Sequence, residues 1–346
     1  MGRIKALDGL RAVAVGLVIW AHLSSHFSGR GDALGMLGVR IFFVLSGFLI
    51  TSLMVGERKR SGRISISSFY LRRAFRILPA FYTFLIAVAV ANICHIIYIP
   101  NQSFISSLLY IRNYAAWDVY TGHLWSLSVE EQFYIVWPVV MSLTRTRGAC
   151  LCAGLMLPVS FAVRTFSSFT LPGALGFFAN ADSLACGCLV ALLWSHLANV
   201  ALWQRIISSG WFRVTPLIIL GLVKLQSIGH FRAAATLLIN VLIAALIERI
   251  VRYPMGPITR ILSSRPFTVT GTLSYSLYLW QQPFAGGSAL PIQQAPWNLL
   301  AIVTCATASY RLVEAPMLRV GANFRERLDL RRAAKPSFGL SIARHS

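Results

Sequence analysis

The chain has 346 residues, of which 56% are hydrophobic and only 12% are charged, and its mean hydropathy is +0.65. Soluble domains carry about 25% charged residues, so the composition excludes an ordinary soluble protein and indicates an integral membrane protein. A net charge of +21 would favour nucleic-acid binding in a soluble chain. Here the arginines lie between apolar runs, so we expect them to set membrane topology and to contact anionic lipid, not nucleic acid.

The apolar runs are about 20 residues long, the length that crosses a bilayer as a helix, and they do not alternate as membrane strands do. The sequence therefore predicts an all-α, polytopic membrane protein with about ten transmembrane helices. A membrane domain over residues 1–320 is expected to precede a basic, partly disordered tail over residues 321–346. The expected spans are 7–25, 35–55, 78–99, 123–144, 149–165, 174–195, 212–229, 231–250, 267–285 and 297–317.

The lysines and arginines predict the orientation of these spans. With both termini in the cytoplasm, and with basic residues near the end of a span counted with the adjoining side, 24 of the 32 basic residues are cytoplasmic, 5 are on the opposite side and 3 are within spans. Basic residues concentrate on the cytoplasmic side of membrane proteins, so we expect a multi-pass protein with both termini cytoplasmic.

The first expected span, L-D-G-L-R-A-V-A-V-G-L-V-I-W-A-H-L-S-S, contains the ionisable residues Asp8, Arg11 and His22. A charge near the middle of a membrane helix costs roughly 2.5–3.5 kcal/mol on insertion scales, so these residues indicate a function. Arg11 and His22 are eleven residues apart. At about 100° and 1.5 Å per residue, they share one helix face and lie about 16 Å apart along the axis, which suits two contacts to one long ligand.

Two arginine-containing stretches follow. In G-V-R-I-F-F-V-L-S-G-F-L-I-T, Arg40 opens the second span, where a helix-packing face and a ligand contact are equally compatible with the pattern. In R-R-A-F-R, Arg73 and Arg76 share a helix face next to Arg72. Such a cluster binds phosphates through forked donors, although topology and lipid headgroups are the simpler explanation of this stretch alone.

The most specific stretch is G-H-L-W-S-L-S-V-E-E-Q-F-Y-I-V-W-P, where Glu130, Glu131 and Gln132 interrupt an apolar helix. Carboxylates within a membrane indicate function by default. His123 lies seven residues before Glu130, nearly two turns, and so shares its face. The two helices enter the membrane from opposite sides. When residues are counted from the end at which each helix enters, His22 and Glu130 lie at similar depths in a hydrocarbon core about 30 Å thick. We therefore predict that Glu130 pairs with His22 and orients its imidazole.

Lesser polar features are Asp182 in N-A-D-S-L, the stretch Tyr275–Pro283, and Y-R-L-V-E-A-P. In the last of these, Arg311 and Glu314 are three residues apart and are expected to pair. Two C-x-C pairs lie in apolar runs with few nearby carboxylates, so we interpret them as helix-packing residues and expect neither a metal site nor a disulfide framework. These pairs are Cys150, Cys152, Cys186 and Cys188.

Taken in order, these stretches closely resemble the membrane-bound acyltransferase 3 family of bacterial O-acyltransferases. The resemblance implies transfer of an acyl group, commonly acetyl from acetyl-CoA, to a hydroxyl of a cell-envelope or secreted glycan, in the bacterial cytoplasmic (inner) membrane. Some members carry a soluble esterase domain behind the membrane part, and we expect none here. The resemblance rests on L-D-G-L-R with His22, G-V-R-I-F-F-V-L-S-G-F-L-I, F-Y-L-R-R-A-F-R-I-L-P, H-L-W-S-L-S-V-E-E-Q-F-Y, S-Y-S-L-Y-L-W and the closing E-A-P.

The family's motifs fall on specific positions of this sequence. Its Arg-x10-His pattern falls on Arg11 and His22, its R-x-x-R on Arg73 and Arg76, and the glutamate of its V-E-x-Q run on Glu130.

The sequence also departs from the family's pattern. Many members carry Asp where Arg40 stands, His where Gln281 stands, and R-A-D where this chain has Asn180-Ala181-Asp182. The resemblance therefore does not imply a ligand contact at Arg40, Gln281 or Asn180.

We predict that acyl-CoA approaches from the cytoplasm and that Arg11 and the cluster Arg72–Arg76 bind its phosphates. The pantetheine arm then extends toward His22. His22, oriented by Glu130, acts as general base on the acceptor hydroxyl or takes the acyl group itself. His123, Arg40 and Asp182 are expected to contact substrate or to support the site.

Acetyl-CoA enters this scheme as a substrate, with no tightly bound cofactor. The expected partners are acyl-CoA, a glycan or lipid-linked saccharide acceptor, and membrane lipids. The alternative is a transporter or permease that moves a glycan or an acyl donor through a polar centre. A structural scaffold is disfavoured because buried histidine and glutamate would be costly in one.

Overall fold

The computed structural model describes residues 4–28, 31–166, 176–226, 228, 231–285 and 290–333, with the side chains of 25–28, 31–32 and 325–333 left out. This part of the chain contains helices and no strands. The helices are α1 (Lys5–Ser28), α2 (Gly31–Ser61), α3 (Ile66–Ile93), α4 (Asn101–Leu108), α5 (Leu124–Leu143), α6 (Thr146–Phe166), α7 (Phe177–Leu192), α8 (Trp194–Asn199), α9 (Ala201–Ser208), α10 (Thr215–Leu225), α11 (Arg232–Arg252), α12 (Pro257–Leu262), α13 (Arg265–Trp280), α14 (Gln282–Ala285), α15 (Trp297–Ser309) and α16 (Ala315–Ala333).

The predicted all-α class is confirmed, whereas the number of spans remains a prediction. Five described helices are long and apolar enough to cross a membrane, namely α1, α2, α3, α6 and α11. The segments Ala201–Ser208 and Gly210–Leu225 meet at 57° and bring the number to six if they form one bent span. The helices α7, α13 and α15 have 16, 16 and 13 residues, fewer than the roughly 20 that cross a bilayer.

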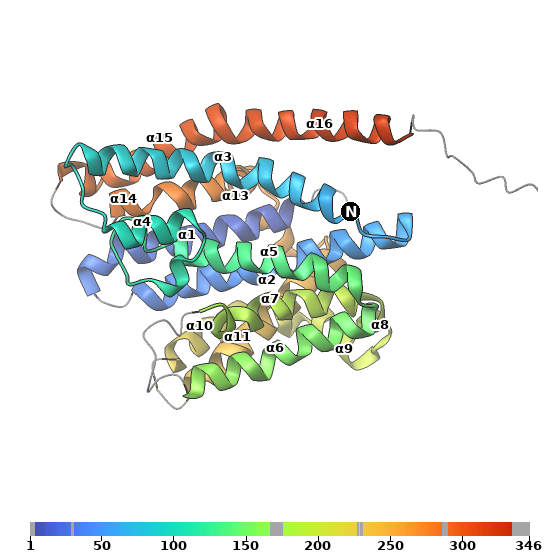
Figure 1. Ribbon diagram of the computed structural model, residues 1–346. Helices are drawn as coiled ribbons and strands as arrows, with labels where there is room; N and C mark the ends of the chain where they lie inside the picture. Colours follow the sequence, from blue (N-terminus) through green and yellow to red (C-terminus); the bar gives the residue numbers. More distant parts are fainter. Residues whose placement is uncertain are drawn as a thin grey trace, which may run out of the picture.

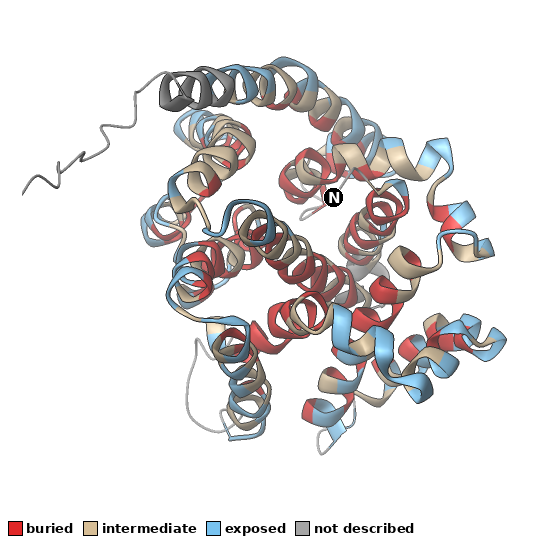
Figure 2. Cartoon of the chain, turned by 90° about the vertical axis from the view of Figure 1, so that its right-hand side faces the viewer, coloured by how far each residue is buried: buried red, intermediate tan, exposed pale blue. Residues whose placement is uncertain are grey.

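The long helices run side by side along one direction, as Figure 1 shows. We call the end of this bundle where α1 begins the N-terminal end, and the other end the far end. α1 packs against α2 and α13, while α7 packs against α2 and α6. Viewed along the bundle, the buried residues concentrate on the central helices and the exposed ones on the rim (Figure 2). Polar side chains on the central helices are thus held inside the protein.

Glycines let α2 and α7 approach to backbone contact. A Cβ atom at Gly47 would lie 2.0 Å from the carbonyl oxygen of Leu184, and one at Gly187 would lie 2.1 Å from that of Val44. Only a residue without a side chain fits at such distances, and membrane helices commonly associate through small residues. This contact fixes the rotation of α2, and with it the directions of the polar side chains that α2 carries.

The last apolar helix is interrupted by a π-helical segment, Tyr310–Glu314, between α15 and α16. The predicted pair of Arg311 and Glu314 is wrong. Arg311 is exposed, whereas Glu314 is 2% exposed and accepts a hydrogen bond of 2.9 Å from Ser276. The reason is the wider turn of a π-helix, in which residues three apart no longer share a face. α16 then continues past residue 320 to Ala333, and residues 334–346 of the expected tail lie outside the described chain.

Candidate functional site

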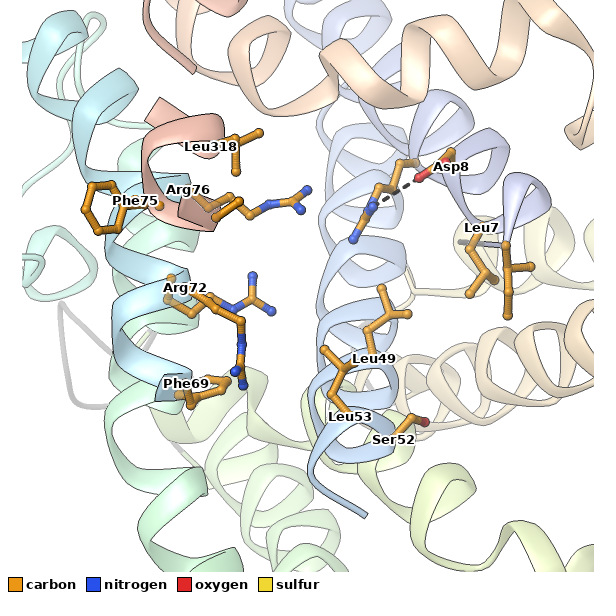
Figure 3. Close-up of a pocket in the computed structure, with 15 residues that line it drawn as sticks. Leu7, Asp8, Leu49, Ser52, Leu53, Phe69, Arg72, Phe75, Arg76 and Leu318 are labelled. Atoms are coloured by element: carbon orange, nitrogen blue, oxygen red, sulfur yellow. Dashed lines mark hydrogen bonds and ion pairs between the residues drawn. The ribbon is translucent and has the colours of Figure 1, made fainter. Parts of the chain in front are cut away.

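A cavity of about 380 Å³ lies near the N-terminal end of the bundle, between α1, α2, α3 and α16 (Figure 3). Arg11 of α1 and Arg72, Arg73 and Arg76 of α3 all line it. Arg11 forms an ion pair of 3.3 Å with Asp8, and Arg72 forms one of 3.8 Å with Glu57. Among the described residues that line the cavity, the four arginines face one carboxylate, that of Asp8. The structure thereby brings together the arginines of two separate stretches in which a phosphate-binding role was predicted. We call this space the arginine cavity.

A second cavity, of about 80 Å³, continues from the arginine cavity. Arg11, Arg73 and Arg76 line both spaces, so the two are adjacent. The second cavity is also lined by Glu130 and Glu131 of α5, and we call it the glutamate cavity. Three guanidinium groups therefore separate an arginine-rich space from one that contains two carboxylates.

Glu130 is held by hydroxyl groups from two helices. Ser46 of α2 and Tyr134 of α5 both donate hydrogen bonds to its Oε1. The guanidinium of Arg73 lies 4.4 Å from the centroid of the Tyr134 ring, a cation–π distance. The ring of Tyr134 thus connects the arginine cluster with Glu130. The sequence analysis did not single out Tyr134, although it stands four residues after Glu130, the spacing of side chains on one helix face.

The other end of the glutamate cavity is formed by Ser126 of α5 and Tyr278 of α13. Their hydroxyl oxygens lie 2.6 Å apart, and the Tyr278 hydroxyl donates to the carbonyl of His123 at 2.9 Å. The Tyr278 ring lies 5.6 Å from the imidazole of His123. His123 is 1% exposed, so the cavity ends against a fully buried histidine.

His22 of α1 lies beyond this point. Its side chain is half-buried and close enough to His123 for the charges of the two imidazoles to interact. The hydrogen bonds described for Glu130 lead to Ser46 and Tyr134. Direct pairing of Glu130 with His22 therefore remains a prediction. What the structure does show is a succession of polar groups from Arg11 through Glu130 and Tyr278 to the two histidines.

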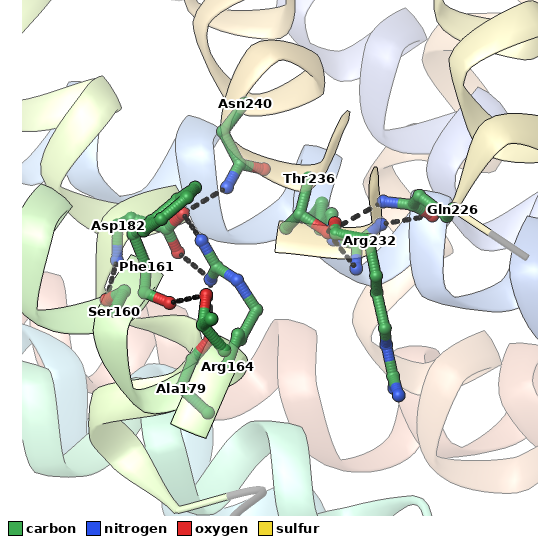
Figure 4. A network of polar contacts seen from close by, with 11 residues as sticks. Ser160, Phe161, Arg164, Ala179, Asp182, Gln226, Arg232, Thr236 and Asn240 are labelled. Carbon is green, nitrogen blue, oxygen red and sulfur yellow. Dashed lines mark hydrogen bonds and ion pairs between the residues drawn. The ribbon is translucent and has the colours of Figure 1, made fainter. Parts of the chain in front are cut away.

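Asp182 and Gln226, the hydrogen-bond partner of Arg40, belong to a different set of polar contacts, shown in Figure 4. Asp182 is 0% exposed, and it forms an ion pair of 2.6 Å with Arg164 and accepts a hydrogen bond of 3.0 Å from Asn240. Arg40 donates to Gln226 at 3.0 Å and lies within electrostatic reach of Asp182 and Arg164. A buried charge needs such partners, so the network has a structural explanation.

This network and the glutamate cavity lie on different faces of α2. Six residues separate Arg40 from Ser46, which is about 240° of rotation at about 100° per residue. Among the described residues that line the two cavities, neither Arg40 nor Asp182 is present. The two roles predicted for this pair, substrate contact and support of the site, therefore stay predictions.

The loop before α5 contains an ion pair between Arg112 and Asp118 that the sequence analysis did not predict. Arg112 is 2% exposed and lies 2.6 Å from Asp118, which also accepts the backbone N–H of Thr121 at 2.8 Å. Burial raises the pKa of the Asp118 carboxyl, but hydrogen bonds from Thr121 and the charge of Arg112 outweigh burial and hold the pKa below its ordinary value of 3.8. The pair anchors the segment that leads into His123.

Comparison with known proteins places the sequence in a family. A family model described as an acyltransferase domain, Acyl_transf_3, matches residues 4–309, nearly the whole apolar part of the chain. The chain belongs to the acyltransferase 3 family. The resemblance inferred from the motifs is thereby confirmed, and together the family and the apolar helices indicate a multi-pass membrane protein.

Curated relatives are named as O-acetyltransferases. The chain is 30% identical over 358 residues to the "Putative peptidoglycan O-acetyltransferase YrhL" of Bacillus subtilis, covering 92% of this chain and 55% of the relative. It is 29% identical over 365 residues to the "O-acetyltransferase OatA" of Staphylococcus aureus, covering 92% of this chain and 58% of the relative. The chain thus spans somewhat more than half the length of these relatives. No solved structure matches it.

Proposed function

We propose that this membrane protein is an O-acyltransferase that moves an acyl group, acetyl in the first instance, from acyl-CoA to a hydroxyl of an envelope or secreted glycan. The observation that carries the proposal is the pair of adjacent cavities, in which three shared arginines lie between a cationic entrance and a carboxylate-containing interior. The name of the Bacillus subtilis relative suggests peptidoglycan as the acceptor class.

In this proposal the donor binds from the N-terminal end of the bundle, which faces the cytoplasm. Coenzyme A carries several phosphate groups, and guanidinium groups bind phosphate oxygens with paired hydrogen bonds. Arg11, Arg72, Arg73 and Arg76 provide such donors from two helices. The thioester end of the donor then extends through the glutamate cavity toward Tyr278 and His22, and the expected distance of about 16 Å between Arg11 and His22 suits this long arm.

The chemistry is attack of an acceptor hydroxyl on the thioester carbonyl. A new C–O bond forms, the C–S bond breaks, and coenzyme A leaves as a thiolate. His22 accepts the hydroxyl proton as the oxygen attacks and can return it to the thiolate. In the second form of the proposal, the imidazole of His22 first takes the acyl group and then passes it to the hydroxyl. Glu130, fixed by Ser46 and Tyr134, favours the positive charge that develops on the imidazole.

The proposal is tested by mass spectrometry of surface and secreted glycans from cells with and without the gene. We expect glycan-bound acyl groups to disappear without the gene, to return with the wild-type gene, and not to return with His22→Ala. His196 of α8 is exposed, so His196→Ala is a matched control that should restore the modification fully. Unchanged glycans in the deletion strain would refute the proposal. A transporter, the alternative compatible with a polar centre, would move label across the membrane without forming an acyl ester.

A further inference from the structure

A cluster of buried polar groups without hydrogen-bond partners lies just beyond the end of the glutamate cavity. It consists of His123, Trp280 and Gln281, which we call the outer cluster. Gln281 is 0% exposed and His123 is 1% exposed. Within the described part of the chain, the Oε1 of Gln281 and the Nε1 of Trp280 are buried and make no hydrogen bond. The ring nitrogens of His123 are also buried and make none of normal geometry, although the imidazole lies near the backbone of Leu279.

Phe84 links two of these side chains, and the third follows directly in the sequence. The ring of Phe84 lies 5.6 Å from the imidazole of His123 and 5.5 Å from the indole of Trp280, edge-on to both. Gln281 follows Trp280 where α13 ends, and its Nε2 donates to Gln282 at 3.3 Å. The outer cluster therefore joins the start of α5 to the end of α13, next to Tyr278 and the glutamate cavity.

A structural role does not account for the outer cluster. A buried polar group without a partner costs about 1–3 kcal/mol, and folded proteins retain few of them. Other buried groups of this kind are scattered on different helices, such as the hydroxyl of Ser309 and the Oδ1 of Asn240. Only in the outer cluster do several such groups meet among the described residues, and there they lie beside the predicted reaction centre at His22.

The chemistry of the outer cluster matches a ligand with hydroxyl groups. Trp280 offers an N–H donor, Gln281 offers a carbonyl acceptor, and the imidazole of His123 offers one of each. A hydroxyl group both donates and accepts hydrogen bonds, so the hydroxyl groups of a ligand can pair with the donors and with the acceptors of the outer cluster. The three side chains include no arginine or lysine, which distinguishes the outer cluster from the arginine cavity that suits the phosphates of the donor.

We infer that His123, Trp280 and Gln281 form the acceptor subsite, which binds the hydroxyl groups of a saccharide and holds one of them beside His22. The inference rests on the proposed acyltransferase function and adds the residues that recognise the acceptor. It places the donor and the acceptor on opposite sides of Tyr278. The acceptor reaches the subsite from the far end of the bundle, opposite to the arginine cavity.

The inference predicts an uncommon combination of effects. Trp280→Phe keeps an aromatic ring but removes the N–H, and Gln281→Met keeps the volume but removes the amide. The indole N–H of Trp280 and the Oε1 of Gln281 have no partner in the described part of the free protein, and Gln281→Met gives up only the 3.3 Å hydrogen bond to Gln282, so both variants should keep nearly the wild-type melting temperature. Binding of the acceptor should weaken, because its hydroxyls lose the groups that would satisfy them.

The experiment uses membranes that contain the full-length protein, radiolabelled acetyl-CoA, and envelope glycans extracted from cells that lack the gene. Initial rates are measured while either the glycan or acetyl-CoA is varied. We expect Trp280→Phe and Gln281→Met to raise the glycan concentration for half-maximal rate about tenfold, the effect of losing about 1.4 kcal/mol of binding. The half-maximal concentration of acetyl-CoA should stay within about twofold of the wild-type value.

Ser309→Ala is the matched control, because it also removes one buried hydroxyl without a described partner, but away from the outer cluster. It should change neither half-maximal concentration. An unchanged glycan requirement in both cluster variants would overturn the inference. A lower melting temperature together with equal increases in the half-maximal concentrations of glycan and of acetyl-CoA would also overturn the inference, because that combination indicates a structural role. If the wild-type protein transfers no label at all, the proposed function itself fails, so the two failures are distinguishable.

Discussion

Replacement of Arg11 by glutamine tests the role of the arginine cavity. Arg11 lines both cavities, and its side chain is 24% exposed beside the 10% exposed Asp8. A hydrogen bond to a charged group contributes about 1.5–3 kcal/mol, so loss of one guanidinium–phosphate contact should weaken acetyl-CoA binding about 10- to 100-fold. Isothermal titration of the purified protein with acetyl-CoA measures this change. The glycan concentration for half-maximal rate should change much less, because the acceptor subsite lies beyond Tyr278.

The variant also removes the ion pair of 3.3 Å with Asp8, which complicates its interpretation. The double variant Asp8→Asn with Arg11→Gln should regain the melting temperature that the single variant loses, while acetyl-CoA binding stays weak. Arg311→Gln is the control, since Arg311 is exposed and lines neither cavity among the described residues. Wild-type affinity for acetyl-CoA in Arg11→Gln would refute the assignment of the arginine cavity to the donor.

Three further predictions concern other parts of the structure. Gly47→Ala places a Cβ atom 2.0 Å from a backbone oxygen and should lower stability by about 1–3 kcal/mol, seen as a lower melting temperature, whereas Gly16→Ala meets nothing within 4 Å and should not. Tyr134→Phe removes a hydroxyl that donates to Glu130 and should lower kcat about tenfold with little change in the KM for acetyl-CoA; equal kcat values would contradict a positioning role. The folded-state pKa of Asp118 lies below its ordinary value of 3.8, so its contribution to stability is complete above that pH and is lost as the pH falls through the lower, folded-state pKa. The melting temperature of wild-type protein should therefore fall more steeply in that acidic range than that of Asp118→Asn.

Helical spacing made part of the site predictable from the sequence. Arg73 and Arg76 share a face because they are three residues apart, and the structure places both on the cavity that Arg11 also lines. The all-helical class followed from apolar runs of bilayer length. In both cases the information is local, since the period of one helix determines which side chains point the same way.

The contacts that the sequence analysis did not predict depend on which helices face each other. Spacing placed Glu130 on a helix face but could not show that Ser46 of α2 would donate to it. In the same way, spacing could not show that Arg40 of α2 would donate to Gln226 or that Asp182 of α7 would pair with Arg164 of α6.

Glu314 was assigned the wrong partner because the helical period itself changes there. The expected pair assumed an α-helix, and the π-helical segment turns this carboxylate toward Ser276. Such an insertion has no signature in the hydrophobic pattern, since one extra residue in a turn alters neither the composition nor the length of the run noticeably.

The most direct test of the account is transfer of radiolabelled acetyl from acetyl-CoA to extracted envelope glycan by the purified protein in lipid vesicles. The account predicts labelled glycan with the wild-type protein. His22→Ala should leave the glycan unlabelled while it still binds acetyl-CoA with wild-type affinity, because the phosphate contacts lie at the arginine cavity. Absence of labelled glycan with the wild-type protein, or transfer at the wild-type rate by His22→Ala, would contradict the account.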